Sequence, residues 1–126
     1  MQASDIMRGL NPQALQSRES GHEVFIEDVK DPDDRWYRIE YRCRPDGSNA
    51  MAWLIYSPWN ANPFPYTQSH LGSDNFICVG PGLSHTSSPY DLDYVVKRAR
   101  FWCAGYSYLR EHGFEATCRA IPDWRG

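Results

Sequence analysis

The feature that most constrains this chain is a long amphipathic helix pattern in its last third. From Leu92 to Leu109, apolar residues recur every three or four positions, and the pattern stops at His112-Gly113. Ser88-Pro89-Tyr90-Asp91 has the form of a capping box with proline at the first helical position, so we predict that the helix begins there. Cys103 falls on the apolar stripe, which indicates a core position. The charged residues fall mostly on the opposite, solvent-facing side: Lys97, Arg98, Arg100, Arg110 and Glu111.

The middle of the chain carries strand patterns. Trp36 to Arg44 alternates apolar and charged residues, and Cys43 lies on the apolar face. Residues 23–29 also form a predicted strand, and turn signals separate the two. Met51 to Tyr56 is apolar throughout, as expected of a strand that is covered on both faces. These strands form a meander, to which residues 76–79 add a short fourth strand.

The N-terminal segment has helical spacing at Ile6, Met7, Leu10 and Leu15, with a possible cap and first-turn proline at Asn11-Pro12. We therefore predict one helix here, either interrupted or short and confined to the second half of the segment. An N-terminal helix, an antiparallel meander of three to four strands, a long loop and a long C-terminal helix make a two-layer α+β fold. We expect one domain over residues 1–126.

Composition excludes several classes of protein. A hydrophobic content of 41% with 14% aromatic residues argues against disorder, and a net charge of −3 argues against nucleic-acid binding. The N-terminus lacks the apolar region of a signal peptide, and the longest apolar run is too short to span a membrane. We expect a cytoplasmic protein that binds neither membrane nor nucleic acid, needs no cofactor, and keeps its four cysteines as reduced thiols.

The chemistry concentrates in and after an aperiodic stretch over residues 57–73, which is long for a structureless loop in a compact domain. His70 lies in this loop. Cys78 follows it at the end of a short apolar run, directly before Gly80-Pro81-Gly82, where regular structure gives way to another loop. Cys78 is thus the candidate nucleophile; the alternative is a small buried hydrophobe.

These residues resemble those of ubiquitin-conjugating enzymes. Leu54 to Pro65 loosely matches the family's aliphatic strand end followed by a loop of prolines and aromatics, and Asp74 to Gly80 matches its Gly-x-Ile-Cys-Leu segment well. The family's His-Pro-Asn is not kept, because Ser69-His70-Leu71 stands in its place. Loss of the asparagine with retention of a histidine is a feature of divergent bacterial members. The resemblance extends over nearly the whole chain.

The resemblance implies that Cys78 accepts a ubiquitin-like protein as a thioester from an activating, adenylating enzyme and passes it to a lysine of a protein substrate. It also implies a bacterial conjugation or anti-phage defence operon. His70 would assist the thiol, and Asn75, His70 or backbone amides near Gly80 would replace the missing asparagine as oxyanion support. His85 lies in the loop where the family orients the incoming lysine.

Other classes stay open at the level of sequence. One is a non-catalytic adaptor of the same fold that binds a ubiquitin-like protein or a partner enzyme. Another is a zinc site formed by Cys43, His70, Cys78 and His85, which lacks the usual short ligand spacings. A third is a small cysteine hydrolase that pairs Cys78 with His85 or His112. Cys118 and Trp124, in the C-terminal tail, could dock that tail or frame a partner site. Self-association is not predicted either way.

Overall fold

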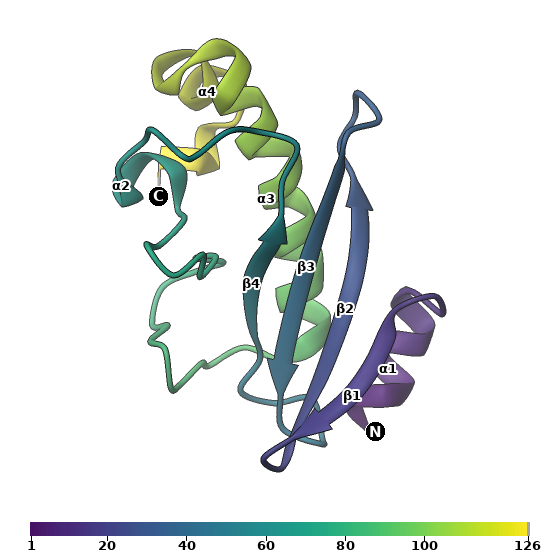
Figure 1. Ribbon diagram of the computed structural model, residues 1–126. Coiled ribbons are helices and arrows are strands. Elements are labelled where there is room, and N and C mark those ends of the chain that lie inside the picture. The colour runs from purple at the N-terminus through teal and green to yellow at the C-terminus, as the bar shows by residue number, and fades with distance from the viewer. Residues whose placement is uncertain (126) are drawn as a thin grey trace.

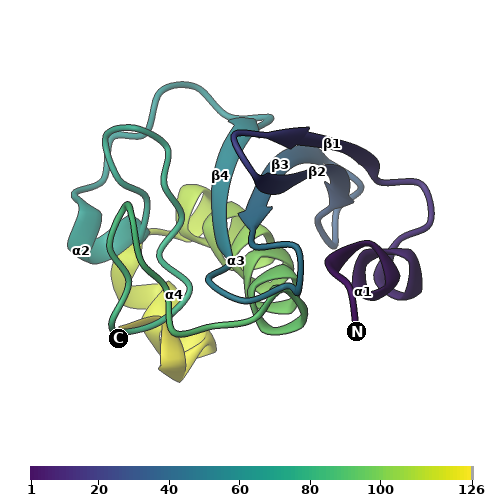
Figure 2. The same cartoon turned by 90° about the horizontal axis from the view of Figure 1, so that it is seen from below.

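The chain forms two layers, a four-stranded sheet and a helical layer, in a computed structural model that describes residues 1–125 (Figure 1). The helices α1 and α3 lie on the same face of the sheet (Figure 2). This arrangement is the α+β class that the sequence predicts. In chain order the elements are α1 (Ala3–Leu10), β1 (Leu15–Glu19), β2 (His22–Lys30), β3 (Trp36–Cys43), β4 (Met51–Tyr56), α2 (Tyr66–Ser69), α3 (Leu92–His112), α4 (Phe114–Ala120) and the 3-10 turn η1 (Pro122–Arg125).

The sheet is an antiparallel meander in the order β1-β2-β3-β4. On its covered face Tyr41 of β3 lies between Phe25 of β2 and Ala52 of β4, and all three side chains are buried. The alternation that predicts β3 therefore reflects a real division between core and surface. Cys43 belongs to the core, as predicted.

The prediction for the N-terminal segment was wrong at Leu15. The helix ends at Leu10, where the backbone N–H of Asn11 closes on the Met7 carbonyl and the Asn11 side chain accepts the Gln13 N–H. An asparagine that bonds its own backbone two residues on favours a turn, and the proline after it reinforces the break. Leu15 instead begins β1, an edge strand whose five residues are all exposed.

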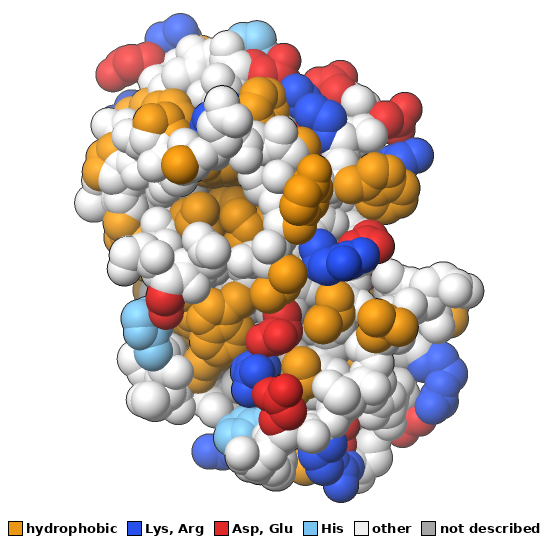
Figure 3. Space-filling model, in the orientation of Figure 1, with side chains coloured by type: hydrophobic (Ala, Val, Ile, Leu, Met, Phe, Trp, Pro, Cys, Tyr) orange, Lys and Arg blue, Asp and Glu red, His pale blue; other side chains and the backbone are white. Residues whose placement is uncertain are grey.

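The strand β4 was predicted to be covered on both faces, but only Met51, Ala52 and Leu54 are buried and Trp53 is half-buried. Ile55 and Tyr56 are 50% and 57% exposed. The strand lies at the edge of the sheet, and the chain segment that packs beside it reaches only as far as Leu54. The face of the sheet away from α3 is open, and hydrophobic side chains there alternate with Arg38–Asp28 and Arg42–Glu40 ion pairs (Figure 3).

The long helix α3 begins three residues later than predicted. Its N-cap is Asp91, whose carboxylate accepts the Tyr94 N–H at 3.0 Å, whereas Ser88 accepts the Tyr90 N–H in a local turn before the helix. The predicted end at His112 is confirmed, and Gly113 follows with a φ of 87° that suits glycine. Cys103 is buried on the predicted stripe.

Polar groups in the core are paired. Asp31, at the turn between β2 and β3, has a fully buried side chain that accepts hydrogen bonds from the Ser107 hydroxyl at 2.6 Å and from Arg35. Tyr37 shares the Ser107 hydroxyl, and the indole of Trp59 donates to Tyr37. This network joins the sheet, the helix α3 and the long loop after β4.

The Asp31 network predicts a loss of stability in acid. Burial alone would raise the pKa of Asp31, but the hydrogen bonds from Ser107 and Arg35 outweigh it, so the pKa lies below the ordinary 3.8. A carboxylate with a lowered folded-state pKa contributes stability that is complete above the unfolded pKa and is lost as pH falls through the folded one. Urea unfolding between about pH 6 and pH 2 should show this loss below about pH 4.

The comparison variant for this measurement is Asp31→Asn, which should be less stable than the natural protein at pH 6 and should lose less stability on acidification. The exposed Asp34, with a side chain 83% accessible, provides the control Asp34→Asn, which should keep the natural acid response. Equal acid responses for the natural protein and Asp31→Asn would contradict the assignment.

No helix within residues 1–125 has the length and apolar character needed to cross a membrane. The four cysteines are unpaired thiols, and Cys78 is the one that is half-buried while the other three are buried.

Candidate functional site

The predicted nucleophile Cys78 and the predicted helper His70 face each other across a short turn-back of the chain. His70 ends the helix α2 in a left-handed conformation, and its carbonyl accepts the Cys78 N–H at 2.9 Å. Between these two residues, Leu71 and Ile77 form one isolated antiparallel β-bridge. The backbone therefore fixes His70 beside Cys78 without a regular hairpin.

The predicted strand over residues 76–79 is reduced to single bridges. Phe76 pairs with Trp53, and the Ile77 N–H donates to the Ala52 carbonyl at 3.0 Å, so the segment borders β4 for only two residues. The prediction of a fourth strand here was wrong. Asn75 precedes the segment with a φ of 66°, and after Ile77 the chain leaves β4, because the Cys78 N–H bonds to the His70 carbonyl.

Cys78 opens into a cavity of about 290 Å³. Its thiol donates to the carbonyl of Gly80, with 3.6 Å between sulfur and oxygen. Interaction with the Cys78 thiol, together with burial, raises the pKa of Tyr66, on α2, to about 12. The cavity is lined by His70, Cys78, Val79, Gly80, Pro81, Tyr94, Arg98, Phe101, Trp102, Asp123 and Trp124.

The C-terminal segment holds His70 in place. The Nε2 atom of His70 lies 2.5 Å from the backbone oxygen of Trp124, and because a carbonyl only accepts, Nε2 must carry the proton. In the neutral ring Nδ1 then keeps the lone pair that can accept a proton. The Trp124 indole packs edge-on to the His70 ring and donates to the Gln68 carbonyl at 2.8 Å.

The position of Trp124 depends on a glycine of α3. A Cβ atom at Gly105 would lie 2.3 Å from the Trp124 ring, so the indole occupies the space that a side chain would fill. Trp102, one turn earlier on α3, donates to the Ser69 carbonyl at 2.9 Å. Two indoles thus anchor the end of α2, and with it His70. Trp124 therefore docks the tail, one of the two roles that the sequence left open for it.

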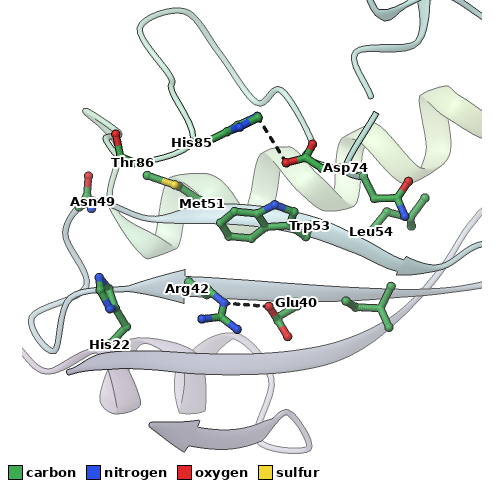
Figure 4. Close-up of a pocket in the computed structure, with 12 residues that line it drawn as sticks. His22, Glu40, Arg42, Asn49, Met51, Trp53, Leu54, Asp74, His85 and Thr86 are labelled. Carbon is green, nitrogen blue, oxygen red and sulfur yellow. Dashed lines mark hydrogen bonds and ion pairs between the residues drawn. The ribbon is translucent and has the colours of Figure 1, made fainter. Parts of the chain in front are cut away.

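Asn75 and His85, the other two predicted site residues, lie elsewhere. Both line a second cavity of about 790 Å³ that opens on the uncovered face of the sheet, over Trp53 (Figure 4). The His85 ring points to Asp74 at 3.5 Å and packs against Phe76. The structure brings His70 and Cys78 together and places Asn75 and His85 outside the lining of their cavity.

Other features of the site were missed from the sequence. Arg98 was assigned to a solvent-facing side of α3, yet it lines the Cys78 cavity. Tyr66 and Asp123 carry no pattern that marks them as neighbours of Cys78, because only the folded chain brings them there. For Tyr66, the one available sequence signal was its place in the proline-rich loop over residues 57–73.

The alternative sites are not assembled among residues 1–125. No three His, Cys, Asp or Glu side chains in this range lie close enough together to hold a metal ion, so Cys43, His70, Cys78 and His85 form no such group. Burial raises the pKa of Cys43 to about 12, as expected of a core thiol. The histidine that shares the Cys78 cavity is His70, whereas the hydrolase alternative requires His85 or His112.

Comparison with known proteins assigns the chain to no family. No protein-family model, no curated protein and no solved structure matches it.

Proposed function

We propose that this protein is a ubiquitin-conjugating-like enzyme that carries a ubiquitin-like protein as a thioester on Cys78 and transfers it to a lysine. The observation that carries the proposal is the position of the Cys78 thiol, which is half-buried in a cavity beside His70 while the other cysteines are buried. A working thiol must be reachable, and a structural one need not be. The order of helix, antiparallel sheet, long loop and long helix agrees with such an enzyme.

The first step is an exchange between two thioesters. The Cys78 thiolate attacks the thioester carbonyl on the activating enzyme, a new carbon–sulfur bond forms at Cys78, and the old one breaks to release the activating enzyme's thiolate. Cysteine suits this step because the bond formed and the bond broken are of the same kind. The Tyr66 hydroxyl, whose pKa is raised by interaction with Cys78, is the candidate donor to the thiolate.

The second step moves the acyl group to an amine. The lysine nitrogen attacks the Cys78 thioester, a carbon–nitrogen bond forms, the carbon–sulfur bond breaks, and the amine gives up a proton. His70, which lines the same cavity, is the candidate acceptor for that proton, because its Nε2–H is committed to Trp124 and its Nδ1 is left with a lone pair. The catalytic roles of Asn75 and His85 stay predictions from the sequence, and neither residue is used in this proposal.

The partners implied are a ubiquitin-like protein, an activating enzyme and a protein substrate, in the setting of a bacterial conjugation or anti-phage operon. Genes for such partners beside this one would identify the proteins to test. The protein should be incubated with ATP and both partners, and the adduct followed on gels with and without reductant.

The adduct is expected to disappear with reductant and to be absent in Cys78→Ala. The variant Cys78→Ser should give an oxyester, which reductant leaves intact and hydroxide cleaves. Cys118→Ala is the matched control, because Cys118 is a free thiol only 8% exposed, and its variant should form the adduct normally. With a verified partner set, an adduct that resists reductant, or no adduct, would overturn the proposal. Binding of the ubiquitin-like protein without an adduct would indicate an adaptor instead.

A further inference from the structure

One cationic side chain in the Cys78 cavity has no fixed partner. Arg98 lines the cavity from α3, and its Nε atom is buried without a hydrogen bond, the one buried side-chain nitrogen or oxygen in residues 1–125 left in this state. A buried donor that bonds to nothing costs about 1–3 kcal/mol, so such groups call for an explanation.

The neighbours of Arg98 do not satisfy it. Its guanidinium lies over the Phe101 ring, 5.0 Å from the centroid, which orients the group but supplies no hydrogen-bond acceptor. Asp123 lines the same cavity, but none of the ion pairs among residues 1–125 joins it to Arg98. The cavity therefore contains one cation and one anion that are not neutralised by each other.

The charge of Arg98 also affects the Tyr90 hydroxyl, a group that Cys78 affects as well. Burial and the adjacent Tyr94 raise the pKa of Tyr90, Cys78 raises it further, and Arg98 lowers it. The Tyr90 hydroxyl donates to the Pro81 carbonyl at 2.6 Å and fills the space beside Gly80, two residues after Cys78. Cys78 and Arg98, which line one cavity, thus both influence the same hydroxyl.

We propose that Arg98 forms an anion-recognition subsite in the Cys78 cavity, and that the amine acceptor entering this cavity carries a carboxylate. Guanidinium groups bind carboxylates through paired N–H donors, and no ion pair among residues 1–125 engages the guanidinium of Arg98. The donor protein cannot supply the anion at the reacting end, because thioester formation consumes its terminal carboxylate. Asp123, of opposite charge on the same lining, suits the acceptor's ammonium.

The acceptor part of this inference rests on the proposed function, whereas the subsite does not. The subsite can be tested with two small electrophiles that both alkylate Cys78 with loss of iodide, anionic iodoacetate and neutral iodoacetamide. We expect Arg98→Met to lower the ratio of the iodoacetate rate to the iodoacetamide rate by about five- to tenfold, the effect of removing one charge at contact range. Rates are read by mass spectrometry of the peptide that contains Cys78.

Two matched variants accompany this measurement. Lys97→Met removes the same charge from the neighbouring position of α3, where the side chain is 62% exposed, and should leave the rate ratio unchanged. Arg98→Lys keeps the charge and should retain most of the natural ratio. Thermal unfolding of each variant confirms that the fold is intact before rates are compared.

Protection of Cys78 tests the class of acceptor. Nα-acetyl-lysine carries both an ammonium and a carboxylate, while Nα-acetyl-lysine amide carries the ammonium alone. We expect the first to slow alkylation of Cys78 by iodoacetamide more than the second, and the difference to vanish in Arg98→Met.

The subsite is refuted if Arg98→Met slows both electrophiles equally, or if Lys97→Met reproduces its effect, because the cause is then a change in the thiolate or a diffuse field. Equal protection by the acid and the amide, or none by either, overturns the carboxylate-bearing acceptor. These assays use no ubiquitin-like protein. A rate ratio that falls in Arg98→Met but not in Lys97→Met, with no thioester adduct in the natural protein, would mean that the subsite is correct and the conjugating function is wrong.

Discussion

Replacing Arg100 with methionine is expected to lower the free energy of unfolding by about 3 kcal/mol, because it leaves a buried carboxylate without its cation. Glu27 points from β2 into the core with a side chain only 1% exposed, and the Arg100 guanidinium binds it from α3. Tyr41 and Asn11 donate to the same carboxylate at 2.7 and 3.0 Å, and they would remain. Methionine keeps the apolar stem, so the loss reports the ion pair.

Urea unfolding at neutral pH measures the effect. The double variant Glu27→Gln with Arg100→Met should recover part of the loss, since removal of both charges leaves no unpaired ion in the core. Arg38→Met is the matched control, because Arg38 pairs with Asp28 where both side chains are about half exposed, and its effect should be much smaller. If Arg38→Met destabilises the protein as much as Arg100→Met, the burial of Glu27 is not the cause.

This ion pair also shows where the sequence misleads. The charges on α3 were assigned to solvent because a charged helix face usually is, yet Arg100 reaches a buried acid and Arg98 lines the Cys78 cavity. Helical spacing predicts which side of a helix carries a residue, but it does not predict how far a long side chain reaches around that side. The partner, Glu27, is 73 residues away in the sequence.

The elements that the sequence predicts well are those in which local pattern and burial agree. The strand β3 and the helix α3 each bury one regular face, so their periodicity survives in the residues themselves. The strand β1 buries no residue and is held by pairing with β2 along its backbone, so its side chains carry no pattern. It was missed for that reason.

The predicted site residues also fall into two groups, those that the fold brings into one cavity and those that it does not. His70 and Cys78 are close in the sequence, and the turn-back between them brings both into one cavity. Asn75 and His85 are closer still to Cys78 along the chain, but both line the cavity on the open face of the sheet instead. Trp124 lies 54 residues beyond His70 in the sequence, so no local sequence pattern predicts their contact.

The contact between Trp124 and Gly105 leads to the second large effect, in the variant Gly105→Ala. The added methyl group would lie 2.3 Å from the indole, and the indole is fixed by its hydrogen bond to Gln68, so the C-terminal segment must move. Overpacking a core by one methyl costs about 1–3 kcal/mol, against a gain of up to about 1 kcal/mol from helix propensity. We expect a net loss of stability, together with faster hydrogen exchange in residues 114–125.

The effect should extend to the thiol, because Trp124 is both a wall of the Cys78 cavity and the acceptor for His70. Moving it opens the cavity, so iodoacetamide should alkylate Cys78 faster in Gly105→Ala than in the natural protein. Gly9→Ala is the matched control, since Gly9 lies in α1 with no atom near the added methyl, and there the propensity gain alone should stabilise the protein. If Gly105→Ala were as stable as Gly9→Ala and as slow to alkylate as the natural protein, the C-terminal segment would not be part of the site. A loss of stability without faster alkylation would limit Trp124 to packing and leave His70 positioned by the backbone bond to Cys78 alone.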